Sequence, residues 1–331
     1  MVITNSMKRR FVKDTGLPIK VFENTVFANR LALMDKMFDT TTKWNEFVAL
    51  ADQFNEEREF FEAQESVNQA ALEFIRNSDA MNRFAQDEDM SRFKLKNEGY
   101  PGNGVFKDNN VGKYLLSIDM VKANFTALRH YDPTIFGNAK TYEEFIGLFT
   151  TSEYIKKSKY IRQVIFGNIV PKRQQRYEQY LMDQLLTRFF SVMKFPRKTV
   201  MYFGADEIVF DVSAYVENGT LPETMLNRID KIVSEACDEG VNVRAEYYKL
   251  VKIEGTSGYI KQFMHWGESP TLNQKDFEIK GIDPIEYPFV LRALYDEQPK
   301  DTDFIFNHEG RLAKLLEPIK VSFAETIEKG E

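Results

Sequence analysis

Three acidic residues stand at the ends of apolar, strand-like runs, where a carboxylate can be held in a fixed position. Asp119 ends the run 113–119, and the adjacent pair Asp206 and Glu207 occupies the turn between the two apolar halves of 199–212. Carboxylate oxygens are the ligands that Mg²⁺ prefers, and two carboxylates can bridge the pair of divalent ions used in phosphoryl transfer. We therefore expect these three acids to be catalytic residues of a two-metal phosphoryl transfer.

The expected metal ligands are the carboxylates of Asp119 and Asp206 and the backbone carbonyl of Met120, with Glu207 in an auxiliary role. The expected cofactor is Mg²⁺, as two ions, with Mn²⁺ able to replace it. Each acid also has a purely structural interpretation. Asp119 would then cap the helix that follows its strand, and Asp206 would occupy a turn position simply because Asp favours turns.

The periodicity of apolar residues from position 113 onward predicts the elements that must bring these acids together. The expected strands are 113–119, the two arms of 199–213, 241–254 and its partner 258–266. With helices between them, the order is β-α-β-β-α-β, a common unit in which the first and third strands are neighbours. The sequence therefore predicts an α+β fold with an antiparallel sheet, in which Asp119 lies close to the turn carrying Asp206 and Glu207.

The flanking regions have different patterns. Residues 22–97 carry apolar side chains at helical spacing, and 98–112 is a loop rich in Gly, Asn and Pro. The C-terminal region 267–331 is expected to contain a strand, a helix and a final helix over 311–329.

Composition restricts the class of protein. The 331 residues suffice for one large domain or a few subdomains, and the single cysteine, Cys237, excludes an internal disulfide. No apolar run is long enough to span a membrane, so no membrane partner is expected. We expect a cytoplasmic location, in the host cytoplasm if the chain is phage-encoded.

The charge distribution is uneven. The net charge is −6, but residues 156–198 hold eleven lysines and arginines against two acids. A basic segment within an acidic protein can form a local phosphate-binding surface, or it can simply be a solvated helix face. Its place between the two acidic motifs favours the first interpretation.

Three segments resemble the conserved motifs of family A DNA polymerases. FGADEIVFDVS resembles the third motif, in which an acidic pair leads into an apolar strand, although Ala205 stands where the family has His. YLLSIDMVKANFTALRHYDP resembles the first motif, an apolar strand that ends in the metal-binding Asp. KYIRQVIFG resembles the nucleotide-binding fingers helix, without the Tyr-Gly that closes it in the family. The resemblance covers about 113–213.

The resemblance implies roles for residues outside the acidic motifs. Arg162 would contact the incoming triphosphate, with Lys159 assisting, and Phe166 would stack near the base. Asn124 stands where the family has a Glu that helps to exclude ribose, so it would lie near the nucleotide sugar. The residues implied to bind nucleic acid are Lys172, Arg173 and Arg176.

The resemblance also implies a division of the chain. A helical, thumb-like region would span 1–97, followed by the loop 98–112. A palm would span 113–266, with a short, basic, fingers-like insertion at 152–198, and an α/β extension would span 267–331. For the thumb-like region, a helical interaction domain is the other interpretation.

The expected function is that of a template-directed nucleotidyltransferase, a DNA or RNA polymerase-like enzyme. Its partners would be a nucleic-acid template and primer, nucleoside triphosphates, and phage replication or transcription proteins. Two alternatives use the same residues: a non-catalytic phage structural or nucleic-acid-binding protein on a relict palm, or a metal-dependent nuclease. Ala205 and the missing Tyr-Gly favour the non-catalytic protein, whereas the acids and the basic segment favour the polymerase.

Overall fold

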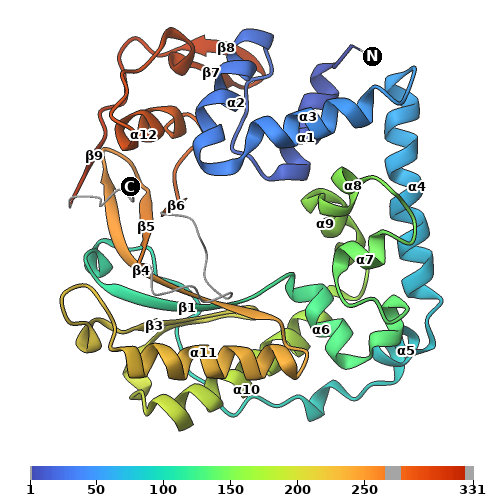
Figure 1. Ribbon diagram of the computed structural model, residues 1–331, viewed down its shortest axis with the longest axis vertical. Coiled ribbons are helices and arrows are strands. Elements are labelled where there is room, and N and C mark those ends of the chain that lie inside the picture. The colour runs from blue at the N-terminus through green and yellow to red at the C-terminus, as the bar shows by residue number, and fades with distance from the viewer. Residues whose placement is uncertain (1, 265–276, 325–331) are drawn as a thin grey trace.

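The computed structural model describes residues 2–264 and 277–324, which combine helices with one large antiparallel sheet (Figure 1). The helices are α1 (Asn5–Thr15), α2 (Asn24–Phe38), α3 (Thr40–Ala51), α4 (Glu57–Arg76), α5 (Asp79–Asn82), α6 (Ala123–Tyr131), α7 (Tyr142–Ile146), α8 (Glu153–Lys157), α9 (Lys159–Gly167), α10 (Pro171–Met193), α11 (Glu223–Asp238) and α12 (Tyr287–Leu294). The strands are β1 (Tyr114–Met120), β2 (Val200–Phe203), β3 (Glu207–Asp211), β4 (Val243–Glu254), β5 (Tyr259–Phe263), β6 (Phe277–Lys280), β7 (Ile305–His308), β8 (Arg311–Lys314) and β9 (Ser322–Phe323). The expected α+β class is confirmed.

The large sheet contains the expected β-α-β-β-α-β unit. Its strand order is β2-β3-β1-β4-β5-β6, with every neighbouring pair antiparallel, and β9 pairs with the far end of β4. The first strand, β1, therefore lies beside the third, β3, as predicted. The expected pairing of 258–266 with 241–254 is confirmed for β5 and β4, whereas residues 265 and 266 lie outside the described residues.

The C-terminal region differs from the expectation in two ways. Strand β6 pairs with β5, so the sheet continues past the boundary expected near residue 266. The final helix expected over 311–329 is wrong for the described part: β8 forms a hairpin with β7, and β9 joins the large sheet. The hairpin turn places Glu309 and Gly310 at φ of 49° and 82°, a left-handed backbone that reverses the chain. The short apolar run after this turn fits a strand as well as a helix, which is why periodicity misassigned it.

Local sequence explains where the long helices begin. Helix α10 begins at Pro171. Proline has no backbone N–H, and it is tolerated here because N–H groups in the first turn have no acceptor within the helix. Ser152 accepts a hydrogen bond from the Ile155 amide and caps α8, and Ser158 caps α9 in the same way. These starts place α8, α9 and α10 as three successive helices between β1 and β2.

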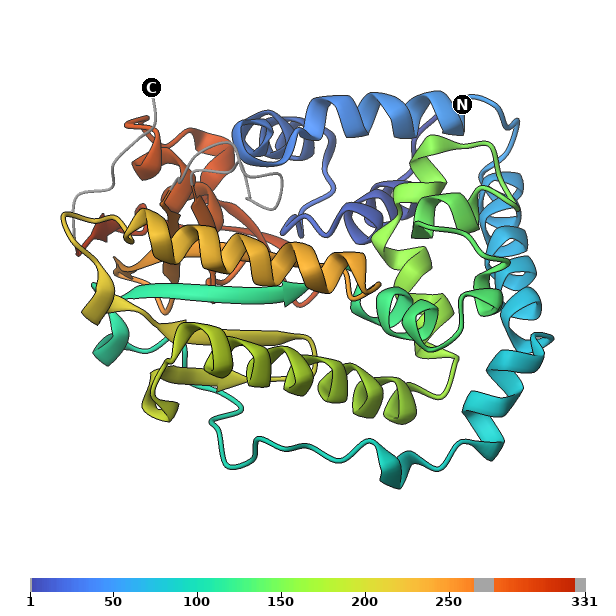
Figure 2. The ribbon, with the colours of Figure 1, turned by 60° about the horizontal axis from the view of Figure 1, so that its bottom comes forward.

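The two faces of the sheet have different surroundings. Helices α10 and α11 pack along the sheet (Figure 2). Leu116 and Ile118 of β1 belong to the main hydrophobic core between the sheet and these helices. Leu115, Ser117 and Asp119 alternate with them and point to the opposite face. There, loop residues such as Val105 pack on the Leu115 end in a second, smaller cluster. The Asp119 end of this second face lies outside that cluster.

The N-terminal helices connect two parts of the protein that are distant in sequence. Helix α1 packs against α9, α3 packs against α8, and α2 packs against α12 and the short helix Asp301–Phe304. The N-terminal helices thus bridge two sides of the molecule: α4 and α6–α9 lie on one side, and α12 with β6–β8 lies on the other (Figure 1). The expected thumb-like region is helical, but it contacts both the fingers-like insertion and the C-terminal extension.

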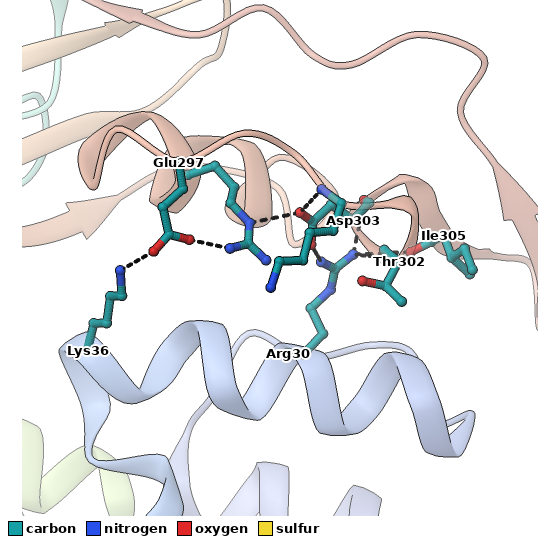
Figure 3. A network of polar contacts seen from close by, with 8 residues as sticks. Arg30, Lys36, Glu297, Thr302, Asp303 and Ile305 are labelled. Atoms are coloured by element: carbon teal, nitrogen blue, oxygen red, sulfur yellow. Dashed lines mark hydrogen bonds and ion pairs between the residues drawn. The ribbon is translucent and has the colours of Figure 1, made fainter.

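A buried polar network joins α2 to the C-terminal extension (Figure 3). Arg30 donates to the Asp303 carboxylate at 2.8 Å, and Arg292 donates to its other oxygen at 2.9 Å. All three residues are buried. Glu297 extends the network by pairing with both Arg292 and Lys36. We name these five residues the C-terminal network; it holds the end of the ribbon against the N-terminal helices.

A second buried polar network joins α1 to the insertion. Asp14 accepts hydrogen bonds from Ser158 at 2.6 Å, Tyr154 at 3.0 Å and Arg10 at 2.9 Å. Burial raises the pKa of Asp14, although the three donors and the Arg10 charge oppose that effect. With both ends tied by buried polar groups, the N-terminal helices are an integral part of the fold.

Candidate active site

The candidate site is a row of charged side chains at the end of β1, on the sheet face away from α10 and α11. Asp119 on β1 pairs in register with Glu207 on β3 and with Arg244 on β4. The guanidinium of Arg244 lies 2.9 Å from the Asp119 carboxylate. The expected proximity of Asp119 and Glu207, 88 positions apart, therefore follows from strand order.

The turn between β2 and β3 brings Asp206 to the same place. The Met120 amide donates to the Asp206 carbonyl at 2.8 Å, so this turn is bonded directly to the end of β1. The Asp206 side chain is exposed, and its charge acts on both Asp119 and Glu178. Sequence reasoning expected Asp119 and Asp206 to form one cluster, and the structure places them together.

A ladder of alternating charges extends the row across the sheet. From Asp119 it passes through Arg244 to Glu246 at 3.2 Å, and from Glu246 to Lys261 at 3.0 Å. Lys261 also lies 3.8 Å from Glu207. Arg244, Glu246 and Lys261 were not expected from the sequence. The alternation of residues along β4 and β5 could have predicted them, because it places charged side chains on the same face of the sheet as apolar ones.

Ser117 gives Glu207 a second partner. Its hydroxyl donates to the Glu207 carboxylate at 2.5 Å, and Ser117 lies two residues before Asp119 on the same face of β1. Glu207 is thus held by a hydroxyl and a buried ammonium. This agrees with an auxiliary role better than with a freely moving catalytic carboxylate.

The electrostatics of Asp119 distinguish it from an ordinary surface acid. Burial raises the pKa of Asp119 to about 6, and the charges of Glu207, Glu246 and Asp206 add to that effect. The Arg244 guanidinium opposes it. A carboxylate with its ionisation shifted toward neutral pH by burial and by like charges is a recognised feature of functional sites.

A further acid approaches the site from the helical layer. Glu178 on α10 is buried and accepts a hydrogen bond from the Asn124 amide at 2.6 Å. Burial raises the pKa of Glu178 to about 7, and the charge of Asp206 contributes. Glu178 is one of the two acids within the basic segment 156–198, and the sequence predicted no role for it. Its signal was an acid on the apolar stripe of α10, where only a residue with a specific partner is tolerated.

Asn124 is therefore engaged by Glu178. It was expected near a nucleotide sugar, and it does lie on α6, directly after the Asp119 strand. Its amide nevertheless serves a protein carboxylate.

The three residues expected to bind nucleotide on α9 lie in different surroundings. The guanidinium of Arg162 sits 5.8 Å from the centre of the Tyr142 ring. Lys159 is exposed and its side chain lies beside Gly16 at the end of α1. Phe166 corrects the expectation: it is 2% exposed and packs into the core, so its ring has no open face on which a base could stack. Phe166 is apolar and lies on the buried face of α9, so it packs in the core instead.

The residues expected to bind nucleic acid divide in the same way. Lys172 is exposed at the start of α10 and Arg176 is partly exposed one turn later. Arg173 corrects the expectation, because it donates to the backbone carbonyls of Phe84 and Glu88 at 3.0 and 2.9 Å. It thereby supplies hydrogen-bond donors at the C-terminal end of the π-helical turn Arg83–Asp87. The sequence alone did not indicate this structural role.

Other basic residues of 156–198 also have protein partners. Arg188 pairs with Glu239 directly after α11, Lys157 lies 3.8 Å from Glu46, and Arg197 donates to the Glu98 carbonyl. The segment therefore joins neighbouring elements at several points instead of presenting one continuous cationic face.

The donor chemistry at the Asp119 row suits a hard divalent cation. The charge of Asp206 acts on Asp119, and this mutual repulsion of the acids is what a cation would relieve. One Asp119 oxygen is already bound to Arg244. Within residues 2–264 and 277–324, no group of three or more His, Cys, Asp or Glu side chains is arranged to hold a metal ion.

Comparison with known proteins adds no relative: no family model, no curated protein and no solved structure matches the chain. Among the described helices, none combines the length and the apolar character that crossing a membrane requires.

Proposed function

We propose that this protein is a template-directed nucleotidyltransferase whose palm is the β2-β3-β1-β4 part of the sheet. The observation that supports the proposal is the register of β1 with β3 and β4. It sets Asp119 beside the turn of Asp206 and Glu207, on the sheet face opposite the one that α10 and α11 cover. Acids at strand ends are well placed to hold a divalent metal beside a phosphate-bearing substrate.

The proposal assigns a role to each side chain in the row. Asp119 and Asp206 would hold Mg²⁺ together with the Met120 carbonyl. When bound there, the metal would help to activate the attacking hydroxyl and to stabilise charge on the phosphates. Arg244 keeps Asp119 oriented and favours its ionised form, because it lies 2.9 Å from that carboxylate. Glu207, held by Ser117 and Lys261, maintains the negative potential of the row.

Nucleotide incorporation tests the proposal directly. The purified chain is incubated with primed and unprimed DNA and RNA templates, labelled ribo- or deoxyribonucleoside triphosphates, and Mg²⁺ or Mn²⁺. We expect incorporation on at least one template class. Asp119→Asn and Asp206→Asn should each reduce it by about a hundredfold or more, because each removes a metal ligand.

Asp211→Asn is the matched control. Asp211 lies on β3 and is paired with Lys113 at 3.4 Å; its side chain is 27% exposed, as is that of Asp119. The control should retain incorporation. Absence of incorporation by the parent protein on every template and with both metals would refute the polymerase proposal.

One observation favours a non-catalytic nucleic-acid-binding protein as the second candidate. Both Asp119 and Glu207 already have cationic partners in Arg244 and Lys261, as in a structural charge network. This candidate predicts nucleic-acid binding that Asp119→Asn and Asp206→Asn leave unchanged, with no incorporation. A nuclease using the same acids would instead release nucleotides from a labelled strand in the same reactions.

A further inference from the structure

A small cavity lies between α6, the turn that follows α11 and the start of α7. Its volume is about 80 Å³, and Lys122, Arg129 and Lys140 line it together with Tyr142. A cavity of this size has room for a few water molecules or one small anion. Three cationic side chains from two segments of the chain therefore converge on a space of anion size.

The cavity carries an excess of positive charge. Lys122 is paired with Glu143, and Arg129 donates through Nε to the Ala139 carbonyl at 2.9 Å. Neither Arg129 nor Lys140 has a carboxylate partner within the described parts of the chain. Two cationic charges at this cavity are thus uncompensated.

Tyr142 supplies an unused buried donor. The residue is 0% exposed, and in the regions that the structure describes its hydroxyl has no hydrogen-bond partner. Burial raises the pKa of Tyr142 well above its usual range, so the hydroxyl keeps its proton at neutral pH. A buried hydroxyl without a partner is costly to leave unsatisfied, and an acceptor that reaches it from the cavity that Tyr142 lines would remove that cost.

The start of α6 adds backbone donors beside the same cavity. Lys122 occupies the N-cap position with φ of 49° and makes no side-chain cap, and the first turn holds no acidic residue. The uncapped amides and the positive end of the helix favour an anion there. The cavity thus combines side-chain cations, a buried hydroxyl donor and a helix start.

We propose that this cavity binds a phosphate group. Its lining begins at Val121, two residues beyond Asp119 and therefore about 7 Å along the chain from it. Assigning the phosphate to a nucleoside triphosphate rests on the proposed function. The same chemistry would also bind free pyrophosphate or inorganic phosphate.

Titration calorimetry with pyrophosphate tests the site without catalysis, in EDTA and about 0.1 M salt, where charges remain partly unscreened. The parent protein should bind pyrophosphate. Tyr142→Phe, which removes only the hydroxyl, and Lys140→Ala should each weaken binding roughly tenfold, because each removes one donor to a charged ligand.

Two control variants match these substitutions. Tyr248→Phe removes another buried hydroxyl that lacks a partner among the described residues, and Lys231→Ala removes an exposed lysine of α11. Neither residue lines the cavity. Both variants should bind as the parent does. No binding by the parent, or equal affinity in the cavity variants and the controls, would overturn the proposal.

Competition identifies the source of the phosphate. Displacement of pyrophosphate by a nucleoside triphosphate, but not by the nucleoside, supports the site and assigns it to nucleotide. Displacement by inorganic phosphate alone supports the site and assigns it to the free anion. Pyrophosphate binding without any nucleotide incorporation would leave this site standing while the polymerase proposal fails, so the two failures are distinguishable.

Discussion

Asp119 on β1 and Glu207 on β3 stand directly opposite each other in an antiparallel pair, and the Met120 amide donates to the carbonyl of Asp206 one residue away. Like charges facing each other across strands are destabilising unless something offsets them. Arg244 and Lys261 offset them here from the other side of β1. The arrangement retains negative charge at a strand end at a cost in stability, as functional sites often do.

Replacing Arg244 should alter the pH dependence of activity. The guanidinium lowers the pKa of Asp119 against burial, which has raised it to about 6. In Arg244→Gln that pKa should rise further, so a larger fraction of Asp119 is protonated at pH 7. We expect the acid limb of the incorporation profile to move upward by roughly one pH unit. Lys113→Gln, which frees Asp211 instead, should leave the profile in place; an unmoved acid limb in Arg244→Gln would contradict the assigned role.

Glu178 should make the protein less stable as pH rises. Burial raises its pKa in the folded state to about 7 from an ordinary 4.5. The folded protein therefore binds a proton that the unfolded chain releases between these values, and stability is lost across that window. Glu178→Gln removes this effect. It should add up to about 3 kcal/mol to the free energy of unfolding at pH 8 and little at pH 4.5.

Urea denaturation at the two pH values measures this difference. Glu223→Gln, which replaces an exposed acid at the start of α11, is the control and should change stability little at either pH. A gain in Glu178→Gln that is equal at pH 4.5 and pH 8 would show that packing, and not ionisation, explains it.

Lys261 should be essential to the charge ladder. It is 4% exposed and lies 3.0 Å from Glu246, itself 2% exposed. Lys261→Met removes one cationic partner of the buried Glu246 carboxylate, which keeps Arg244 at 3.2 Å, and should cost about 3 kcal/mol. The double variant Lys261→Met with Glu246→Gln should recover part of that loss, because the buried charge is then gone as well.

Lys280→Met provides the comparison for Lys261. Lys280 is 34% exposed and pairs with Glu278 at 2.8 Å. Its loss should change the free energy of unfolding by less than about 1 kcal/mol, as is typical of exposed ion pairs. If the double variant were as unstable as the sum of its two single variants, the two side chains would not act as a pair.

The C-terminal network should hold the N-terminal helices against α12. Asp303→Asn removes the carboxylate that Arg30 and Arg292 share and leaves Arg292 paired only with Glu297, which should cost about 3–5 kcal/mol. Hydrogen exchange should show faster opening of α2. Asp301→Asn, an exposed acid of the same short helix that pairs with Lys314 at 3.6 Å, should leave exchange unchanged. Unchanged α2 exchange in Asp303→Asn would mean that apolar packing alone holds this contact.

The alternation of apolar residues determined much of the fold. It located β1, β3 and β4 and set their order, and from that order the pairing of Asp119 with the acidic turn followed. A capping residue such as Ser152 can be recognised from local sequence, because the hydrogen bond that it makes spans only three residues. Properties that depend on near neighbours were therefore predictable.

Properties that depend on distant partners required the tertiary structure. Phe166 and Arg173 carry the side chains expected of ligand-binding residues, yet packing buried the first and backbone carbonyls engaged the second. Glu178 is an isolated acid in the sequence, and only the packing of α10 against α6 gives it Asn124 as a partner. The sequence determined which residues could do chemistry at a strand end. Only the tertiary structure decided which of them remain available for it, because burial and long-range partners set the free energy of each charge.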